Sequence, residues 1–111
     1  MISKFGELVR KLPDEQRIRF YELLAGELTI GIRHVCSISL NPEEKIDQLK
    51  WINEIMHRVI AKIYCERTKS HEWLDTDFED MVGGWVSQNL QIEDIVNNAI
   101  NNSYKYAAEG P

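Results

Sequence analysis

The side chains best suited to chemistry in this sequence are Glu54 and His57, which form a Glu-x-x-His step, together with Glu27 and His34. A Glu-x-x-His step that faces a glutamate on another helix is part of the pattern that binds two metal ions in helical bundles. Carboxylate and imidazole groups suit such metals. The full pattern needs two such steps and two further glutamates, whereas this chain has one step. Glu54 also stands four residues before Arg58, a spacing that pairs charges on a solvent-facing helix. Metal-dependent or acid–base activity at this cluster is therefore the second hypothesis.

The same cluster has a structural interpretation, which we rank first. An antiparallel pair of helices turning near Ser39 would bring Glu27 level with Asn53, Glu54 and His57. Glu27 lies between apolar positions, and a buried glutamate needs a partner. Asn53, His57 or Arg33 can supply one. We therefore predict a structural polar network here, with no metal and no cofactor.

The best predicted helix, which positions half of this cluster, is Asn41 to Arg67. Asn41 is a favoured N-cap, Pro42 suits the first helical position, and Glu44 is placed to complete a capping box. Two further residues, Trp51 and Ile55, widen the apolar arc, so the helix is predicted to contact more than one neighbour. Most apolar residues fall on one broad face at helical spacing: Leu49, Ile52, Met56, Val59, Ile60 and Ile63.

A second helix is predicted from Pro13 to Cys36 or Ser37, with proline and acids in its first turn. Gly26 and Gly31 lower helix propensity, so we interpret them as points of close approach or a local bend. Residues 28–40 are β-branched and partly alternating, which leaves a strand as the alternative there. The apolar face of this helix carries Ile18, Tyr21, Leu24, Ala25, Leu28, Ile32 and Val35.

The remaining elements are short. Residues 2–12 predict an amphipathic helix, and another begins near Ser70 or Asp75 and ends near Asn89, a natural cap or stop. A last helix is predicted over 90–104, with a frayed tail from about residue 105. The Gly83-Gly84 pair either lets a neighbouring helix approach closely or breaks its helix. The sequence thus predicts one all-α domain over residues 1–111, an irregular bundle of four to five helices.

The net charge of −5 is unevenly distributed. Residues 1–69 carry 12 Lys or Arg and 10 Asp or Glu, whereas residues 70–111 carry one base and eight acids. Nucleic-acid binding is disfavoured, because it needs basic side chains along the phosphates. The acidic half predicts a solvated surface that keeps a small domain soluble or, as the alternative, a surface offered to a basic protein partner. The candidate partner-binding residues are Trp51, Trp73, Glu72, Asp75, Asp77, Glu79 and Asp80.

Cysteine usage and hydropathy predict a cytoplasmic protein with reduced thiols. The two cysteines, Cys36 and Cys65, form no disulfide framework and no zinc-type spacing, and we predict both to be small core or boundary residues. We find no signal peptide and no membrane span in the sequence. Nucleophile elbows and phosphate-binding glycine loops are also missing.

These features favour a non-enzymatic role over an enzymatic one. We predict a helical protein–protein interaction module, a regulatory or accessory protein of bacterial or phage type. Apolar residues on two faces of its helices further predict that the partner can be a second copy, giving a homodimer.

Overall fold

A computed structural model of the chain describes residues 8–38, 41–69 and 78–109, and side chains of the last segment from Val82 onward. Nearly all of these residues are helical, and no strand occurs among them, so the predicted all-α class is confirmed. After a helical turn at residues 8–10, the elements are α2 (Asp14–Ser37), α3 (Pro42–Thr68), α4 (Phe78–Gln88), the 3-10 turn η1 (Leu90–Ile92) and α5 (Glu93–Glu109).

Local sequence signals set the limits of α2 and α3. Pro13 precedes α2, and Asp14 and Glu15 occupy its first turn, where the helix dipole favours acids. The Oδ1 atom of Asn41 accepts a hydrogen bond from the backbone N–H of Glu44 at 2.8 Å, which confirms the predicted N-cap of α3. Because α2 stays helical to Ser37, the strand alternative is wrong over its described part.

The C-terminal end of α3 is followed by a residue with an unusual backbone conformation. Lys69 has φ 58°, the left-handed conformation, and its N–H donates to the carbonyl oxygen of Cys65. Glycine is the usual residue at this position because a side chain there is strained. Lys69 is the one non-glycine residue with positive φ in the described part of the chain.

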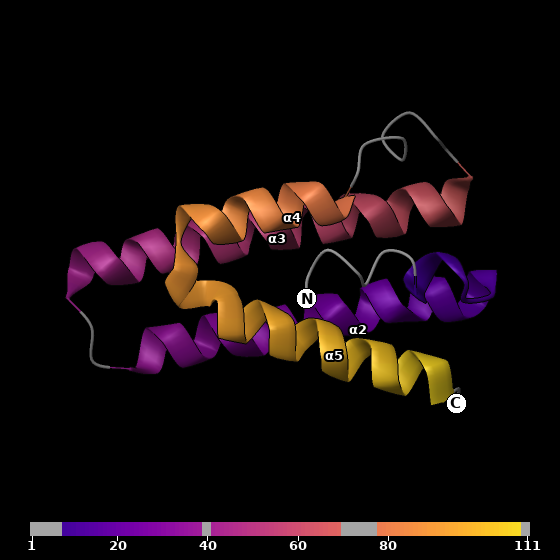
Figure 1. Cartoon of the computed structure of the whole chain (residues 1–111), viewed down its shortest axis with the longest axis horizontal. Helices are drawn as coiled ribbons and strands as arrows, with labels where there is room; N and C mark the ends of the chain where they lie inside the picture. Colours follow the sequence, from indigo (N-terminus) through magenta and orange to yellow (C-terminus); the bar gives the residue numbers. More distant parts are fainter. Residues whose placement is uncertain (1–7, 39–40, 70–77, 110–111) are drawn as a thin grey trace.

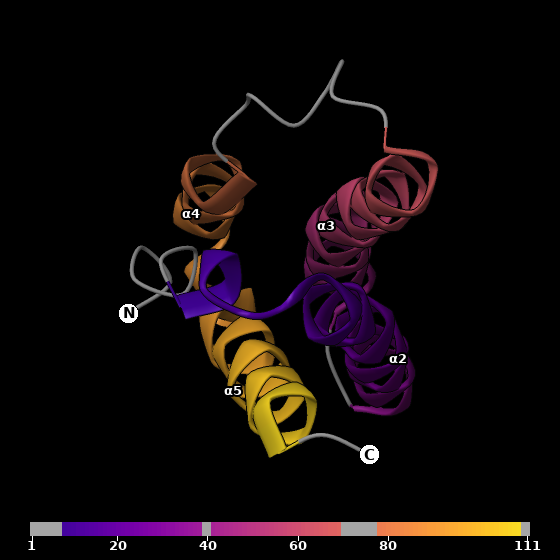
Figure 2. The same ribbon diagram turned by 90° about the vertical axis from the view of Figure 1, so that its right-hand side faces the viewer.

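The helices run up and down as a bundle, each antiparallel to the helix before it (Figure 1). α2 packs against both α3 and α5, whereas α4 packs against α3 and η1. Seen end-on, α2 and α3 form one side of the bundle and α4 and α5 the other (Figure 2). The core between them is apolar and includes Phe20, Leu24, Leu28, Val35, Ile52, Ile55, Val59, Val82, Val86, Ile92, Val96 and Ala107.

Gly31 is a point of close approach between α2 and α5. A Cβ atom built on Gly31 would lie 2.6 Å from Cγ2 of Ile95, so only glycine fits without a shift. Close approach is therefore confirmed at Gly31. At Gly26 and at the Gly83-Gly84 pair a Cβ atom would meet nothing within 4 Å. α4 nevertheless continues unbroken through the pair, so both predicted roles for it are wrong.

One prediction about the ends of the elements is wrong, and two others fall largely outside the described residues. α5 continues to Glu109 and buries Ala107, so the tail predicted to fray from about residue 105 is helical to that point. The predicted start of the fourth helix near Ser70 or Asp75 lies outside the described residues, as does most of the 2–12 helix. No described helix has the length and apolar character needed to cross a membrane.

Candidate functional site

The structure does not assemble the predicted metal or acid–base cluster. Within the three described segments, no group of three or more His, Cys, Asp or Glu side chains is placed to hold a metal ion. The side chains of His34, Glu54 and His57 are all exposed. They offer no enclosed site in which a metal or a catalytic acid could be held apart from water.

Glu27 lies on the wrong side of α2 for that cluster. The antiparallel hairpin of α2 and α3 exists as predicted and places Glu22 level with Arg67. Glu27, however, stands one turn before Gly31 on the face of α2 that meets α5. Glu27 is therefore directed toward the α5 side, while Asn53 lies exposed on α3. In the described part of the chain no hydrogen bond or ion pair joins Glu27 to Asn53, His57 or Arg33, so the predicted polar network is not formed.

The predicted partner-binding residues are only partly visible. Trp51 is half-buried and packs against the core, with Nζ of Lys50 4.9 Å from the centre of its ring. Trp73, Glu72, Asp75 and Asp77 lie outside the described residues. Glu79 and Asp80 fall in the first turn of α4, where the backbone alone is described.

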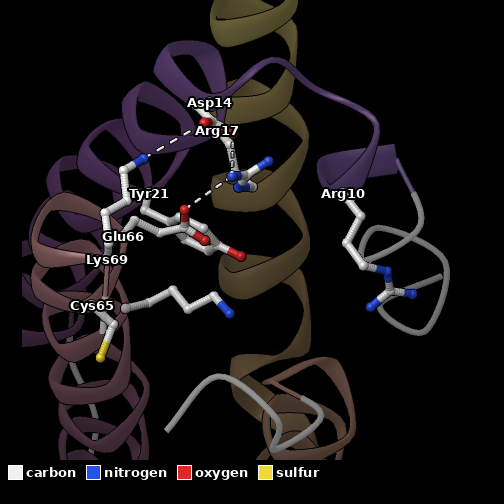
Figure 3. A pocket seen from close by; sticks show the side chains of 8 residues that line it. Arg10, Asp14, Arg17, Tyr21, Cys65, Glu66 and Lys69 are labelled. Carbon is white, nitrogen blue, oxygen red and sulfur yellow. Dashed lines mark hydrogen bonds and ion pairs between the residues drawn. The ribbon is translucent and has the colours of Figure 1, made fainter. Parts of the chain in front are cut away.

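A charged cleft of about 410 Å³ lies where the start of α2 meets the end of α3 (Figure 3). Arg17 is its centre: its guanidinium donates to Asp14 at 2.7 Å, to Glu66 at 3.1 Å and to the backbone oxygen of Leu12 at 3.2 Å. Lys69 adds an ion pair to Asp14 at 3.6 Å. The cleft is lined by Arg10, Asp14, Arg17, Tyr21, Lys62, Cys65, Glu66 and Lys69.

The charges in the cleft stabilise one another. The hydrogen bond to Glu66 raises the pKa of Arg17, although partial burial opposes this. The hydrogen bond from Arg17 and the charge of Lys69 lower the pKa of Asp14. Arg17 and Glu66 are 20% and 11% exposed, so their pairing is shielded from solvent more than an ordinary surface pair. We interpret this cleft as an ionic clasp that holds the two ends of the hairpin together.

A second polar contact fastens the turn between α4 and α5 onto α3. Asn89 is buried, and its Nδ2 donates to Asp47 at 2.6 Å. Its Oδ1 accepts from the N–H of Gln91 at 3.0 Å, which confirms the predicted capping role. Gln48, also buried, donates to the side chain of Gln91. These bonds position helices and leave no group directed at a ligand.

The surface feature that the fold leaves uncovered is the side of the α2–α3 hairpin that faces away from α4 and α5, with no described element over it (Figure 2). We call it the outer hairpin face. Its central seam consists of two rows of half-buried apolar side chains, and within each row the residues are seven positions apart in the sequence. The rows are Ile18, Ala25 and Ile32 on α2, and Leu49, Met56 and Ile63 on α3. Two outer rows flank the seam: Glu22, Thr29 and Cys36 on α2, and Ile46, Asn53, Ile60 and Arg67 on α3.

Large apolar side chains on this face are open to solvent. Ile46 is 65% exposed and Ile60 is 55% exposed, and Tyr64 beside them is 66% exposed. A mostly apolar groove of about 440 Å³ runs along the seam at one end. It is lined by Ile32, Cys36, Ile46, Leu49, Lys50 and Asn53. Exposed Cys36 was predicted to be a core or boundary residue, and its place on this face corrects that prediction.

The sequence placed Ile60 on the buried arc of its helix, so reasoning from the sequence missed this face. The sequence feature that could have revealed this face was the width of the apolar arc of α3, which is wider than the neighbouring helices cover.

No family model, no curated protein and no solved structure matches the chain. The candidate functional site is therefore identified from its geometry and composition alone.

Proposed function

We propose that the chain is a non-enzymatic helical interaction module that binds a protein partner through the outer hairpin face. The observation that carries this proposal is the exposure of Ile46, Ile60 and Tyr64 beside a continuous apolar seam. Contiguous exposed apolar surface on a small domain is typical of a protein interface. A regulatory or accessory role in the cytoplasm, as the sequence predicted, is part of the same proposal.

The chemistry of the face suits a partner helix. Half-buried apolar rows at seven-residue spacing form a groove between two antiparallel helices. An amphipathic helix docks in such a groove through residues at positions i, i+3, i+4 and i+7. The charged residues at its ends, Lys50 and the Glu22–Arg67 pair, provide a polar rim.

Site-specific photo-crosslinking tests the proposal. A photoreactive phenylalanine analogue at position 60 is expected to form a saturable adduct with a protein in extracts of the cell that makes the chain. Ile30 is the matched control position, because it is equally exposed, at 59%, but lies on α2 away from the outer hairpin face. Equal adducts at both positions, or none at either, would remove this face as the interaction site.

A further inference from the structure

We infer that the outer hairpin face binds the same face of a second copy of this chain, so that two α2–α3 hairpins form a four-helix arrangement around a two-fold axis. This inference rests on the proposed function and names the partner. The rows Ile18, Ala25, Ile32 and Leu49, Met56, Ile63 repeat every seven residues. That repeat is the one by which helices pack side by side at a shallow angle over several turns.

The charge of the hairpin permits two copies to meet. α2 and α3 together carry eight Lys or Arg and nine Asp or Glu, so the pair of helices is nearly neutral. The excess acid of the chain lies in residues 70–111. Two copies that meet through α2 and α3 therefore do not bring together like net charges, although each whole chain carries −5.

The positions of the charges select the direction of the two-fold axis. Glu22 and Arg67 are level with one another and form an ion pair at 2.8 Å within one chain. An axis parallel to the helices places α3 opposite α2 of the second copy at the same level. Arg67 then faces Glu22 of the second copy, and the two pairs form a quartet of alternating charge. An axis perpendicular to the helices would instead bring Arg67 to the level of Lys45 of the second copy, so the quartet of alternating charge would not form.

The same axis also matches the shapes along the rows. Ile60 lies level with Ala25 of the second copy, so a large exposed side chain meets a small one. These levels follow from the intrachain contacts at the two ends of the hairpin, Glu22 with Arg67 and the backbone oxygen of Cys36 with Nζ of Lys45 at 3.2 Å.

Sedimentation equilibrium of the purified full chain tests the inference. The mass is expected to move from one chain toward two as the concentration rises through the micromolar range. Ile60→Lys is expected to weaken self-association by at least about tenfold, because a charge would be buried without a partner. Ile30→Lys, the control of equal exposure, is expected to leave it unchanged. A mass of one chain at all concentrations, or equal effects of both variants, would overturn the inference.

Charge reversal tests the axis. Arg67→Glu is expected to weaken the dimer, and the double variant Glu22→Arg with Arg67→Glu is expected to restore it. Strengthening by Arg67→Glu alone would indicate the perpendicular axis and overturn the proposed arrangement. The labelling rate of the Cys36 thiol, which lies on the face, is expected to fall with rising concentration, with buried Cys65 as the internal reference.

Failure of this inference differs from failure of the proposed function. A chain that stays monomeric, yet forms a saturable adduct from position 60 with a different protein, keeps the interaction face and loses the second copy. A chain that stays monomeric and forms no adduct at that position loses both.

Discussion

Gly31→Ala is expected to destabilise the protein, although alanine is the better helix former. In a helix interior, replacing glycine with alanine contributes about 1 kcal/mol of stability. At Gly31 the new methyl group would lie 2.6 Å from Cγ2 of Ile95, well inside contact distance. Cγ2 is attached to the branched Cβ of Ile95, so it cannot move away as the end of a flexible chain can. Overpacking of this kind costs about 1–3 kcal/mol.

Gly26→Ala supplies a control on the same helix. Gly26 is exposed, and its added methyl group would meet nothing within 4 Å. It is expected to gain the propensity term of about 0.5–1 kcal/mol, a rise in Tm of roughly 2–8 °C for a domain of this size. Since both changes remove the same glycine entropy, the difference between the two variants isolates the overpacking. We expect Gly31→Ala to be less stable than Gly26→Ala by about 1–3 kcal/mol.

Urea unfolding at one fixed protein concentration is the assay, because any self-association makes stability concentration-dependent. A double-mutant cycle with Ile95→Ala measures the interaction between positions 31 and 95, since Ile95→Ala removes the obstructing methyl group. In the Ile95→Ala background, Gly31→Ala is expected to become stabilising. If Gly31→Ala were as stable as Gly26→Ala in the natural background, the close approach of α2 and α5 at Gly31 would be refuted.

Two further predictions concern the polar contacts. Asn89→Ala is expected to cost about 1–3 kcal/mol, because the hydrogen bond from buried Asn89 to Asp47 and the cap of Gln91 are both lost. Urea unfolding measures this cost. The control is the exposed Asn101→Ala, which is expected to change stability by less than about 0.5 kcal/mol. Because its pKa is lowered on folding, Asp14 contributes stability above the ordinary carboxyl pKa of about 4, and this contribution is lost as the pH falls through the lowered value. Asp14→Asn should therefore be less stable than the natural chain at pH 6, and the gap should narrow as the pH falls to 3; a gap of unchanged size at pH 6 and pH 3 would contradict the role assigned to the carboxylate.

Much of the fold was predictable because its signals are local. Pro13, Asn41 and Pro42 act on the backbone of their own helix turn, and the structure places the ends of α2 and α3 within a residue or two of the prediction. Gly31 was identified as a candidate for close approach because a glycine inside an apolar helix needs a packing reason. The nature of its neighbour, Ile95, depends on how α5 folds back, and no local pattern specifies that.

The surface and the polar contacts were less predictable because they depend on the rotation of one helix against another. Glu27 lies at the edge of the apolar arc of α2, where a small rotation decides whether it meets α3 or α5. The partners Arg17 and Glu66 are 49 residues apart, and Asp47 and Asn89 are 42 apart, so only the assembled bundle joins them. Ile60 was expected to be buried, but the arc of α3 is wider than its neighbours cover.

The continuous course of α4 through Gly83-Gly84 has a consequence for the order in which the bundle opens. Each glycine makes the local helix less stable by about 1 kcal/mol relative to alanine, and neither recovers that loss through close packing. Among the described elements α4 packs against α3 and η1, with the Arg58 guanidinium 5.9 Å from the ring centre of Trp85. Amide protons of α4 should therefore exchange with solvent through a low-energy local unfolding, while those in the middle of α2 exchange only when the whole domain unfolds.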